Sequence, residues 1–227
     1  MKRCCLGLTV LVICLLVAAA ASAQMGMDLF KKPDIAKAFN PVVGKGAQYL
    51  NTSTSATPAK TSTIEISIVG KESVEGKDGY WMEFVSTTEK NQLSVGKALF
   101  TKDDFQFHRM IVQIPGQGAM EMPFNPTAAN RGKAQESVND WHSVGTESVT
   151  VPAGTFSCEH WRNDKSNSDV WTSDKVTPFG MVKEVSPHGS MVLTKVITDS
   201  QDRITGPVTK FDPQQMMQQM QQQHQKP

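Results

Sequence analysis

Residues 149–161, VTVPAGTFSCEHW, place a short proline–glycine segment between two runs in which apolar and polar side chains alternate. Such alternation is typical of a β-strand that buries one face. Proline suits the first position of a tight loop because its ring fixes φ near about −65°, and glycine suits the last because it adopts a positive φ without strain. The stretch therefore predicts a β-hairpin with its corner at Pro152-Ala153-Gly154 and with Gly154 at positive φ.

The same order of residues returns twice further along the chain, at Thr177-Pro178-Phe179-Gly180 and at Ser186-Pro187-His188-Gly189. Each copy predicts another hairpin corner, with Gly180 and Gly189 at positive φ. Alternating runs separated by closely spaced corners are typical of a meander, in which strands that follow one another in sequence pair side by side.

Upstream runs show the same period of two. Residues 64–68, IEISI, alternate between apolar and polar side chains. In residues 105–114, FQFHRMIVQI, the apolar positions are odd-numbered at first and even-numbered later. Because a β-bulge reverses which side chains point inward, this change of phase predicts a bulge within the run.

Helical signals are few. Apolar residues recur at helical spacing in residues 33–39, and residues 128–139 form a second candidate for a short helix. The chain is therefore expected to be mainly β (α+β), with one or two short helices against an antiparallel sheet.

The two ends differ in composition from the middle. Residues 1–23 combine Lys2 and Arg3 with an apolar run and the small-residue sequence Ala21-Ser22-Ala23, the pattern of a secretory signal peptide. A retained membrane anchor is the alternative, although the apolar run is short for a membrane span. Residues 24–211 would form one domain, and the glutamine- and methionine-rich residues 212–227 are expected to be a disordered tail. The expected location is the periplasm or outside the cell, without a stable membrane span after signal removal.

Charge and cysteine usage exclude several classes of function. Signal removal lowers the count of basic residues from 23 to 21 against 22 acidic residues, so there is no electrostatic reason to expect nucleic acid as a partner. Cys158 alone would remain, so no disulfide can form within the chain. Cys158 and His160 point to one face of a strand, but no further catalytic or metal-binding residue stands near them, and a lone cysteine is usually buried. We expect no enzyme, no metal and no cofactor.

The tail offers one metal-binding alternative. Met216, Met220 and His224 would form one stripe on a helix, and thioether and imidazole groups suit Cu(I). A disordered tail is the simpler interpretation.

Residues 114–126, IPGQGAMEMPFNP, have the prolines and glycines of a loop but also carry large apolar side chains. Loops usually stay polar because they lie at the surface. An apolar, methionine-rich loop could close as a lid over an apolar cleft, since methionine adapts to ligands of variable shape. The alternative is that these side chains plug one open end of the core.

Four stretches, IVGKESVEGKDGYWMEF, VTVPAGTFSCEHW, VWTSDKVTPFGMVKEV and ITGPVTKFD, resemble bacterial envelope proteins related to the lipoprotein-carrier superfamily. The resemblance covers about residues 40 to 211. It implies a half-open, strongly curved antiparallel sheet with helices against its concave face, and a lipid or a lipoprotein acyl chain as ligand. It supplies no catalytic set. Carriers of this kind use a cavity arginine as a latch, and Arg109 is a candidate for that place.

Two functions follow as expectations. The first is an exported, non-catalytic carrier whose partner is an apolar small molecule or a lipoprotein. The second is a ligand-free interaction or structural module of the cell envelope. For the carrier, the expected ligand-binding residues are the apolar side chains of the concave face and of the methionine-rich loop: Ile66, Ile68, Phe84, Phe107, Val112, Met120, Met122, Phe124 and Met191.

Overall fold

The computed structural model describes residues 38–55, 57–114, 118–123 and 140–212. These residues form one sheet of twelve strands. The strands are β1 (Gly46–Ser53), β2 (Lys60–Val74), β3 (Lys77–Thr88), β4 (Leu93–Thr101), β5 (Phe107–Ile114), β6 (Gly118–Glu121), β7 (Trp141–Val151), β8 (Gly154–Asn163), β9 (Ser168–Thr172), β10 (Met181–Ser186), β11 (Gly189–Ile197) and β12 (Val208–Lys210).

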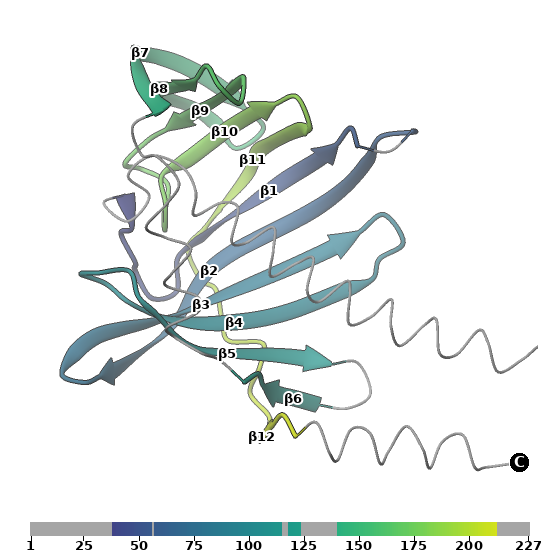
Figure 1. The fold of residues 1–227 in the computed structure, drawn as a ribbon, viewed down its shortest axis with the longest axis vertical. Coiled ribbons are helices and arrows are strands. Elements are labelled where there is room, and N and C mark those ends of the chain that lie inside the picture. Colours follow the sequence, from purple (N-terminus) through teal and green to yellow (C-terminus); the bar gives the residue numbers. More distant parts are fainter. Residues whose placement is uncertain (1–37, 56, 115–117, 124–139, 213–227) are drawn as a thin grey trace, which may run out of the picture.

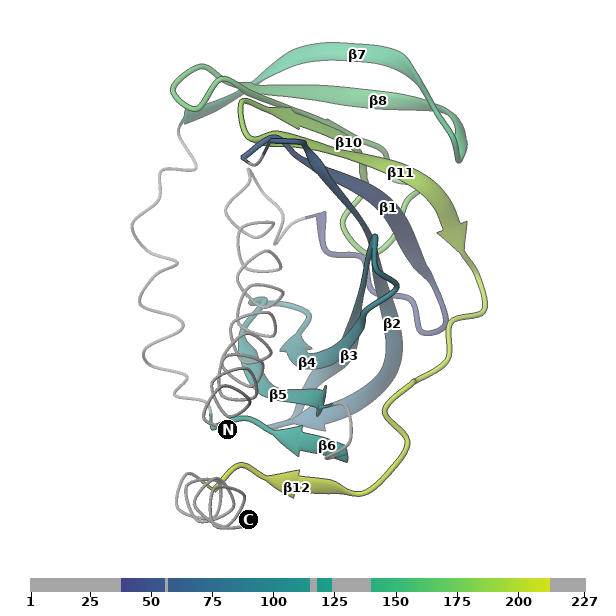
Figure 2. The same cartoon turned by 90° about the vertical axis from the view of Figure 1, so that its right-hand side faces the viewer.

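The sheet consists of two meanders, β1–β6 and β7–β11, which join where β1 pairs antiparallel with β11. The short strand β12 adds to β6 in parallel, and the other pairings are antiparallel. Figures 1 and 2 show a strongly curved sheet that stays open, with β7 and β12 at its two ends. The expected fold, a mainly β chain with one curved antiparallel sheet, is confirmed.

Two of the three predicted corners are tight hairpins. Val151 pairs with Gly154, and Ser186 pairs with Gly189, so each loop contains two unpaired residues. Gly154 and Gly189 have positive φ as predicted, at +133° and +149°. Each glycine is thus the first residue of the returning strand and not the last residue of a three-residue loop.

The third corner, Thr177–Gly180, is not a tight hairpin. It belongs to the longer connection 173–180 between β9 and β10. Gly180 has the predicted positive φ, +74°, because it reverses the chain there: its N–H donates to the carbonyl of Val176 and its carbonyl accepts from the N–H of Ser173, both at 2.7 Å. The proline–glycine pattern predicted the backbone conformation here, but not the length of the loop.

The predicted bulge in residues 105–114 is confirmed. Leu99 of β4 pairs with Arg109, whereas the next residue, Phe100, pairs with Phe107. His108 is therefore the extra residue. The bulge places Phe107 against the main hydrophobic core and Arg109 on the opposite face of the sheet.

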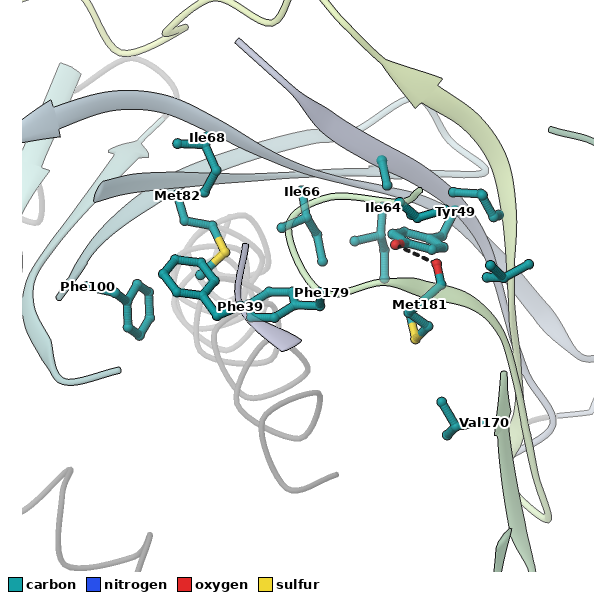
Figure 3. Close-up of a cluster of buried hydrophobic side chains, with 14 of the residues drawn as sticks. Phe39, Tyr49, Ile64, Ile66, Ile68, Met82, Phe100, Val170, Phe179 and Met181 are labelled. Atoms are coloured by element: carbon teal, nitrogen blue, oxygen red, sulfur yellow. Dashed lines mark hydrogen bonds between the residues drawn. The ribbon is translucent and has the colours of Figure 1, made fainter. Parts of the chain in front are cut away.

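The main core lies on the concave side of the sheet, which we call the inner face. Figure 3 shows Ile66, Ile68 and Met82 pointing from the strands toward Phe39 and Phe179. Phe39 lies before β1, whereas Phe179 lies in the 173–180 connection, and their ring centroids are 5.5 Å apart. The Tyr49 hydroxyl donates to the carbonyl of Met181 at 3.0 Å. The same core thus joins both meanders.

The convex side, which we call the outer face, is crossed by residues 198–207, the outer strap, which leads from β11 to β12 (Figure 2). Ile204 of the strap packs with Ile111 and Ala119 in a small second core. Glu65 of β2, Glu83 of β3 and Lys97 of β4 bind the strap at residues 202–204. The strap therefore completes the outer face.

Several expectations concern residues outside the described part of the chain. These are the signal peptide 1–23, residues 33–37 of the candidate helix 33–39, the candidate helix 128–139 and residues 213–227 of the tail. Within the described ranges, helical structure is limited to the region of Ala38 and Asp140. No described helix has the length and apolar character needed to cross a membrane.

Candidate functional site

The strand registers bring four of the predicted ligand-binding residues into one row across the inner face. Ile66 lies opposite Phe84, and Val112 lies opposite Met120. Gly96 of β4 stands between the two pairs, opposite both Phe84 and Val112. Directly opposite residues in an antiparallel pair share a face and lie close together, so these five positions form a continuous apolar row. We call it the inner row.

A second row runs beside the inner row. Ile68 lies opposite Met82, and Ala98 links Met82 to Met110. Met122 continues past the end of β6, where its N–H donates to the carbonyl of Met110 at 2.9 Å. Phe107 and Met191 also pack against the inner core. Eight of the nine predicted residues are thus placed on one face, and Phe124 lies outside the described residues.

Burial divides these residues into two groups. Ile66, Ile68 and Val112 are buried, at 2%, 0% and 9% exposed. Phe84, Phe107, Met120, Met122 and Met191 are only partly buried. All of these partly buried residues except Met191 lie toward the β12 end of the sheet, on β3, β5 and β6 and just beyond the end of β6. That end is therefore the part of the face best placed to contact a ligand.

The expectation of a lid over an apolar cleft is wrong for Met120. Residues 118–121 form β6, which pairs with β5, so Met120 is part of the sheet itself. The alternation of Ala119, Met120 and Glu121 between faces explains this: Ala119 packs in the outer core, whereas Met120 lies in the inner row. The glycines and prolines suggested a loop, but the short run between them satisfies its backbone by pairing.

Sequence reasoning missed Gly96 and Met110. Gly96 has no side chain and gives no hydrophobic signal. A Cβ built at Gly96 would meet the Ile111 carbonyl oxygen at 3.5 Å and Val112 Cγ1 at 3.6 Å, which are ordinary contacts. Met110 is even-numbered like Val112, so the alternation within residues 105–114 could have predicted that both side chains lie on the same face.

Arg109 does not lie on the inner face, so the expected latch position is wrong. The Arg109 guanidinium donates to both carboxylate oxygens of Glu121, at 3.0 and 3.1 Å, and to Glu72 at 3.2 Å. It also stacks over Trp81 at 5.2 Å. The hydrogen bonds from Arg109 lower the pKa of Glu121. The bulge at His108 explains the change of face, because it reverses the phase of the strand before Arg109.

Cys158 is buried, 1% exposed, as the sequence predicted. Burial, together with the nearby Glu147 carboxylate, raises the pKa of its thiol, which disfavours the reactive thiolate. His160 does not activate it: one ring nitrogen faces Glu147 at 3.2 Å and the other faces Asp169 at 2.8 Å. Within the described ranges, no cluster of three or more acidic, histidine or cysteine side chains is arranged to hold a metal.

The fold and the inner row define this chain as an open, curved antiparallel β-sheet protein with an apolar inner face. No protein-family model matches the chain. No curated protein matches it either.

Two solved structures resemble it at low identity. One is a candidate lipoprotein of Parabacteroides distasonis, 17% identical, with a TM-score of 0.38. The other is a candidate exported protein of Bacteroides fragilis with a YmcC-like fold, 10% identical, with a TM-score of 0.36. Each match covers 70% of this chain and 97% of the other. At these values neither structure assigns a family or an activity, and the resemblance to the lipoprotein-carrier superfamily stays a prediction.

Proposed function

We propose that the chain is an exported, non-catalytic protein that holds an apolar ligand, such as a lipid or a lipoprotein acyl chain, against the inner face of its sheet. The observation that carries the proposal is the inner row, Ile66–Phe84–Gly96–Val112–Met120, which crosses five strands without a charged side chain. The signal-peptide pattern of residues 1–23 supports export.

The distribution of charge supports an apolar ligand at this face. Glu83, Lys97 and Arg109 belong to the same strands but lie on the outer face, among the ion pairs there. An acyl chain on the inner row would gain about 0.8 kcal/mol for each CH₂ group it buries. Gly96 leaves the middle of the row without a side chain, which favours a long, thin ligand at that point.

Binding of a fluorescent fatty-acid probe tests the proposal. Replacing Met120 and Met122 together with Asp should weaken binding strongly, because each carboxylate would have to lose water beside the acyl chain. Gln113→Asp is the matched control, since it adds a carboxylate to the exposed outer side of β5. It should bind the probe as the wild type does. A wild-type protein that binds no apolar probe would overturn the proposal.

A second variant tests the same face without charge. Gly96→Leu should fill the middle of the inner row and reduce probe binding, whereas Gly96→Ala adds only a Cβ with ordinary contacts and should bind nearly normally. Far-UV circular dichroism and urea unfolding would verify that each variant is folded. If the double Asp variant unfolds, the comparison of Gly96→Leu with Gly96→Ala tests whether the inner row binds the probe. Unchanged probe affinity in a folded Gly96→Leu protein would count against the inner row as the binding site.

A ligand-free module of the envelope is the second candidate, and the exposed edge of β7 favours it. Native mass spectrometry with lipid extraction separates the two functions. A carrier purified from its own envelope should retain lipid, whereas an interaction module should not.

A further inference from the structure

Strand β7 ends the sheet with one side open: among the described residues it pairs with β8 alone. Residues 142–148 are all exposed. The opposite end is different, because β12 is a strand of three residues. Long exposed edge strands tend to recruit another strand, and proteins usually block them with lysine, proline or a very short edge. Residues 145–151, GTESVTV, contain neither lysine nor proline.

The hairpin register determines which backbone groups face the open side. A two-residue hairpin closes on a hydrogen-bonded pair, here Val151 and Gly154. Because the pattern alternates along a strand, Val149 and Glu147 direct their backbone groups toward β8. Thr146, Ser148 and Thr150 direct theirs away from the sheet, where another strand could pair with them.

Two features limit the regular part of this edge. A register shift between Ser143 and Gly145 marks a bulge at one end, and Pro152 ends the strand at the other. The regular part is residues 145–151, and Ser148 is its middle residue. We propose that β7 pairs antiparallel with β7 of a second copy of this chain, about a two-fold axis at Ser148, so that the two sheets become continuous.

In this register, the side chains of β7 in one copy are compatible with those of β7 in the second copy. Ser148 would lie opposite Ser148 of the second copy, Thr146 opposite Thr150, and Glu147 opposite Val149. Hydroxyl pairs of this kind stabilise antiparallel strands, and no like charges meet. A shift of the axis to Glu147 would set two carboxylates opposite each other, and a shift toward Thr146 would run into the bulge. Glu147 already accepts a hydrogen bond from Trp171 at 2.5 Å on its own sheet.

This interface is independent of the proposed ligand site. The inner row ends on β6, and β7 lies at the other end of the strand order. A two-fold axis perpendicular to the sheet keeps the inner faces of both copies on the same side. Failure of one proposal therefore leaves the other standing.

Sedimentation of the purified protein tests the interface. The wild type should associate to dimers at concentrations on the order of 100 µM, as expected for a small interface. Ser148→Lys places two lysines opposite each other and should weaken the dimer about tenfold or more. Ser157→Lys is the matched control, because Ser157 is exposed and lies opposite Ser148 on β8, one strand in from the edge. It should dimerise as the wild type does.

A cross-linking experiment tests the register separately. In a hydrogen-bonded antiparallel pair, Cα atoms lie about 5.5 Å apart, within reach of a disulfide. Ser148→Cys should therefore form a covalent dimer under mild oxidation, whereas Ser157→Cys, a strand further from the axis, should not. A wild type that stays monomeric, or equal cross-linking of the two variants, would overturn the proposal.

Discussion

At the scale of single residues, the glycines that begin β8 and β11 carry different constraints although they follow the same proline–x pattern. A Cβ on Gly189 would lie 2.0 Å from the carbonyl oxygen of Thr52, whereas the nearest atom to a Cβ on Gly154 is Phe156 Cε2, at 3.9 Å. Gly189 is thus needed both for its φ and for the close approach of β1. Gly154 is needed for its φ alone.

We therefore expect Gly154→Ala to lower the free energy of unfolding by about 1 kcal/mol, the usual cost of a strained φ. Gly189→Ala should cost clearly more, about 3 kcal/mol, because the Thr52 backbone must move as well. Urea unfolding of both variants measures the difference. Equal losses would mean that the contact between Thr52 and Gly189 does not constrain the sheet.

Asp104 gives a pH dependence at the same scale. Burial alone would raise the pKa of its carboxyl, but hydrogen bonds from Lys77 and Thr101 outweigh burial and lower the pKa to about 2. The Lys77 ammonium lies 2.6 Å from the carboxylate. Because the unfolded chain binds the proton at higher pH than the folded chain, this contribution to stability is present above about pH 4 and is lost as pH falls toward about 2.

Asp104→Asn should accordingly cost about 1 kcal/mol at neutral pH, less than the pKa shift alone suggests because solvent screens the partly exposed pair. The difference from the wild type should shrink below pH 4. Unfolding measured across pH 2–7 tests this, and a difference that does not depend on pH would contradict it.

At the scale of elements, charged side chains attach the outer strap to the sheet. Glu83 of β3 is fully buried and accepts hydrogen bonds from the backbone N–H of Arg203 at 2.9 Å and from its guanidinium at 2.8 Å. Lys97 of β4 lies 2.5 Å from Asp202 and donates to the carbonyl of Ile204 at 3.1 Å. Burial raises the pKa of Glu83, and the bonds from Arg203 oppose that effect.

Arg203→Ala should lower the free energy of unfolding by about 3 kcal/mol, because it leaves the Glu83 carboxylate buried without its charged partner. Adding Glu83→Gln to this variant should recover part of the loss. Lys71→Ala is the control, since the Lys71–Asp78 pair is exposed to solvent and its removal should leave the free energy of unfolding almost unchanged. Urea unfolding of the three variants measures these values, and no rescue by Glu83→Gln would show that Arg203 acts by packing alone.

At the scale of the whole molecule, one inner core spans both meanders. Phe39, Phe105 and Phe179 come from three separate segments, and their ring centroids lie 4.9 to 5.8 Å apart. Tyr49 of β1 adds a buried hydrogen bond to Met181 of β10. The two halves of the sheet are therefore held together by shared packing as well as by the β1–β11 ladder.

This arrangement predicts a single cooperative unfolding transition. Fluorescence from Trp81 in the first meander and from Trp171 in the second, isolated by replacing the other tryptophans with Phe, should report the same midpoint in urea. Phe179→Ala should lower both midpoints together, by a loss of about 3 kcal/mol. Separate midpoints would show that the meanders unfold as independent units.

The local features of this protein could be predicted from its amino-acid sequence. Alternation with a period of two depends only on which side chains a pleated strand buries, so it predicted the strands, and the change of phase before Met110 predicted the bulge. Proline and glycine impose φ through their own covalent structure, so Gly154, Gly180 and Gly189 were predicted to have positive φ. Burial of Cys158 was predicted because a lone cysteine on an apolar strand face is usually buried.

The order of the strands in the sheet, and the side chains that each face carries, depend on long-range pairing and packing. The β1–β11 pairing joins residues far apart in sequence, and the inner row depends on the register of five strands, which no local pattern specifies. Gly96 belongs to the inner row because of that register, and it has no side chain from which its place could have been predicted. Arg109 went to the outer face because a bulge of one residue reverses the phase. Local periodicity determines which residues alternate, whereas long-range packing determines what they meet.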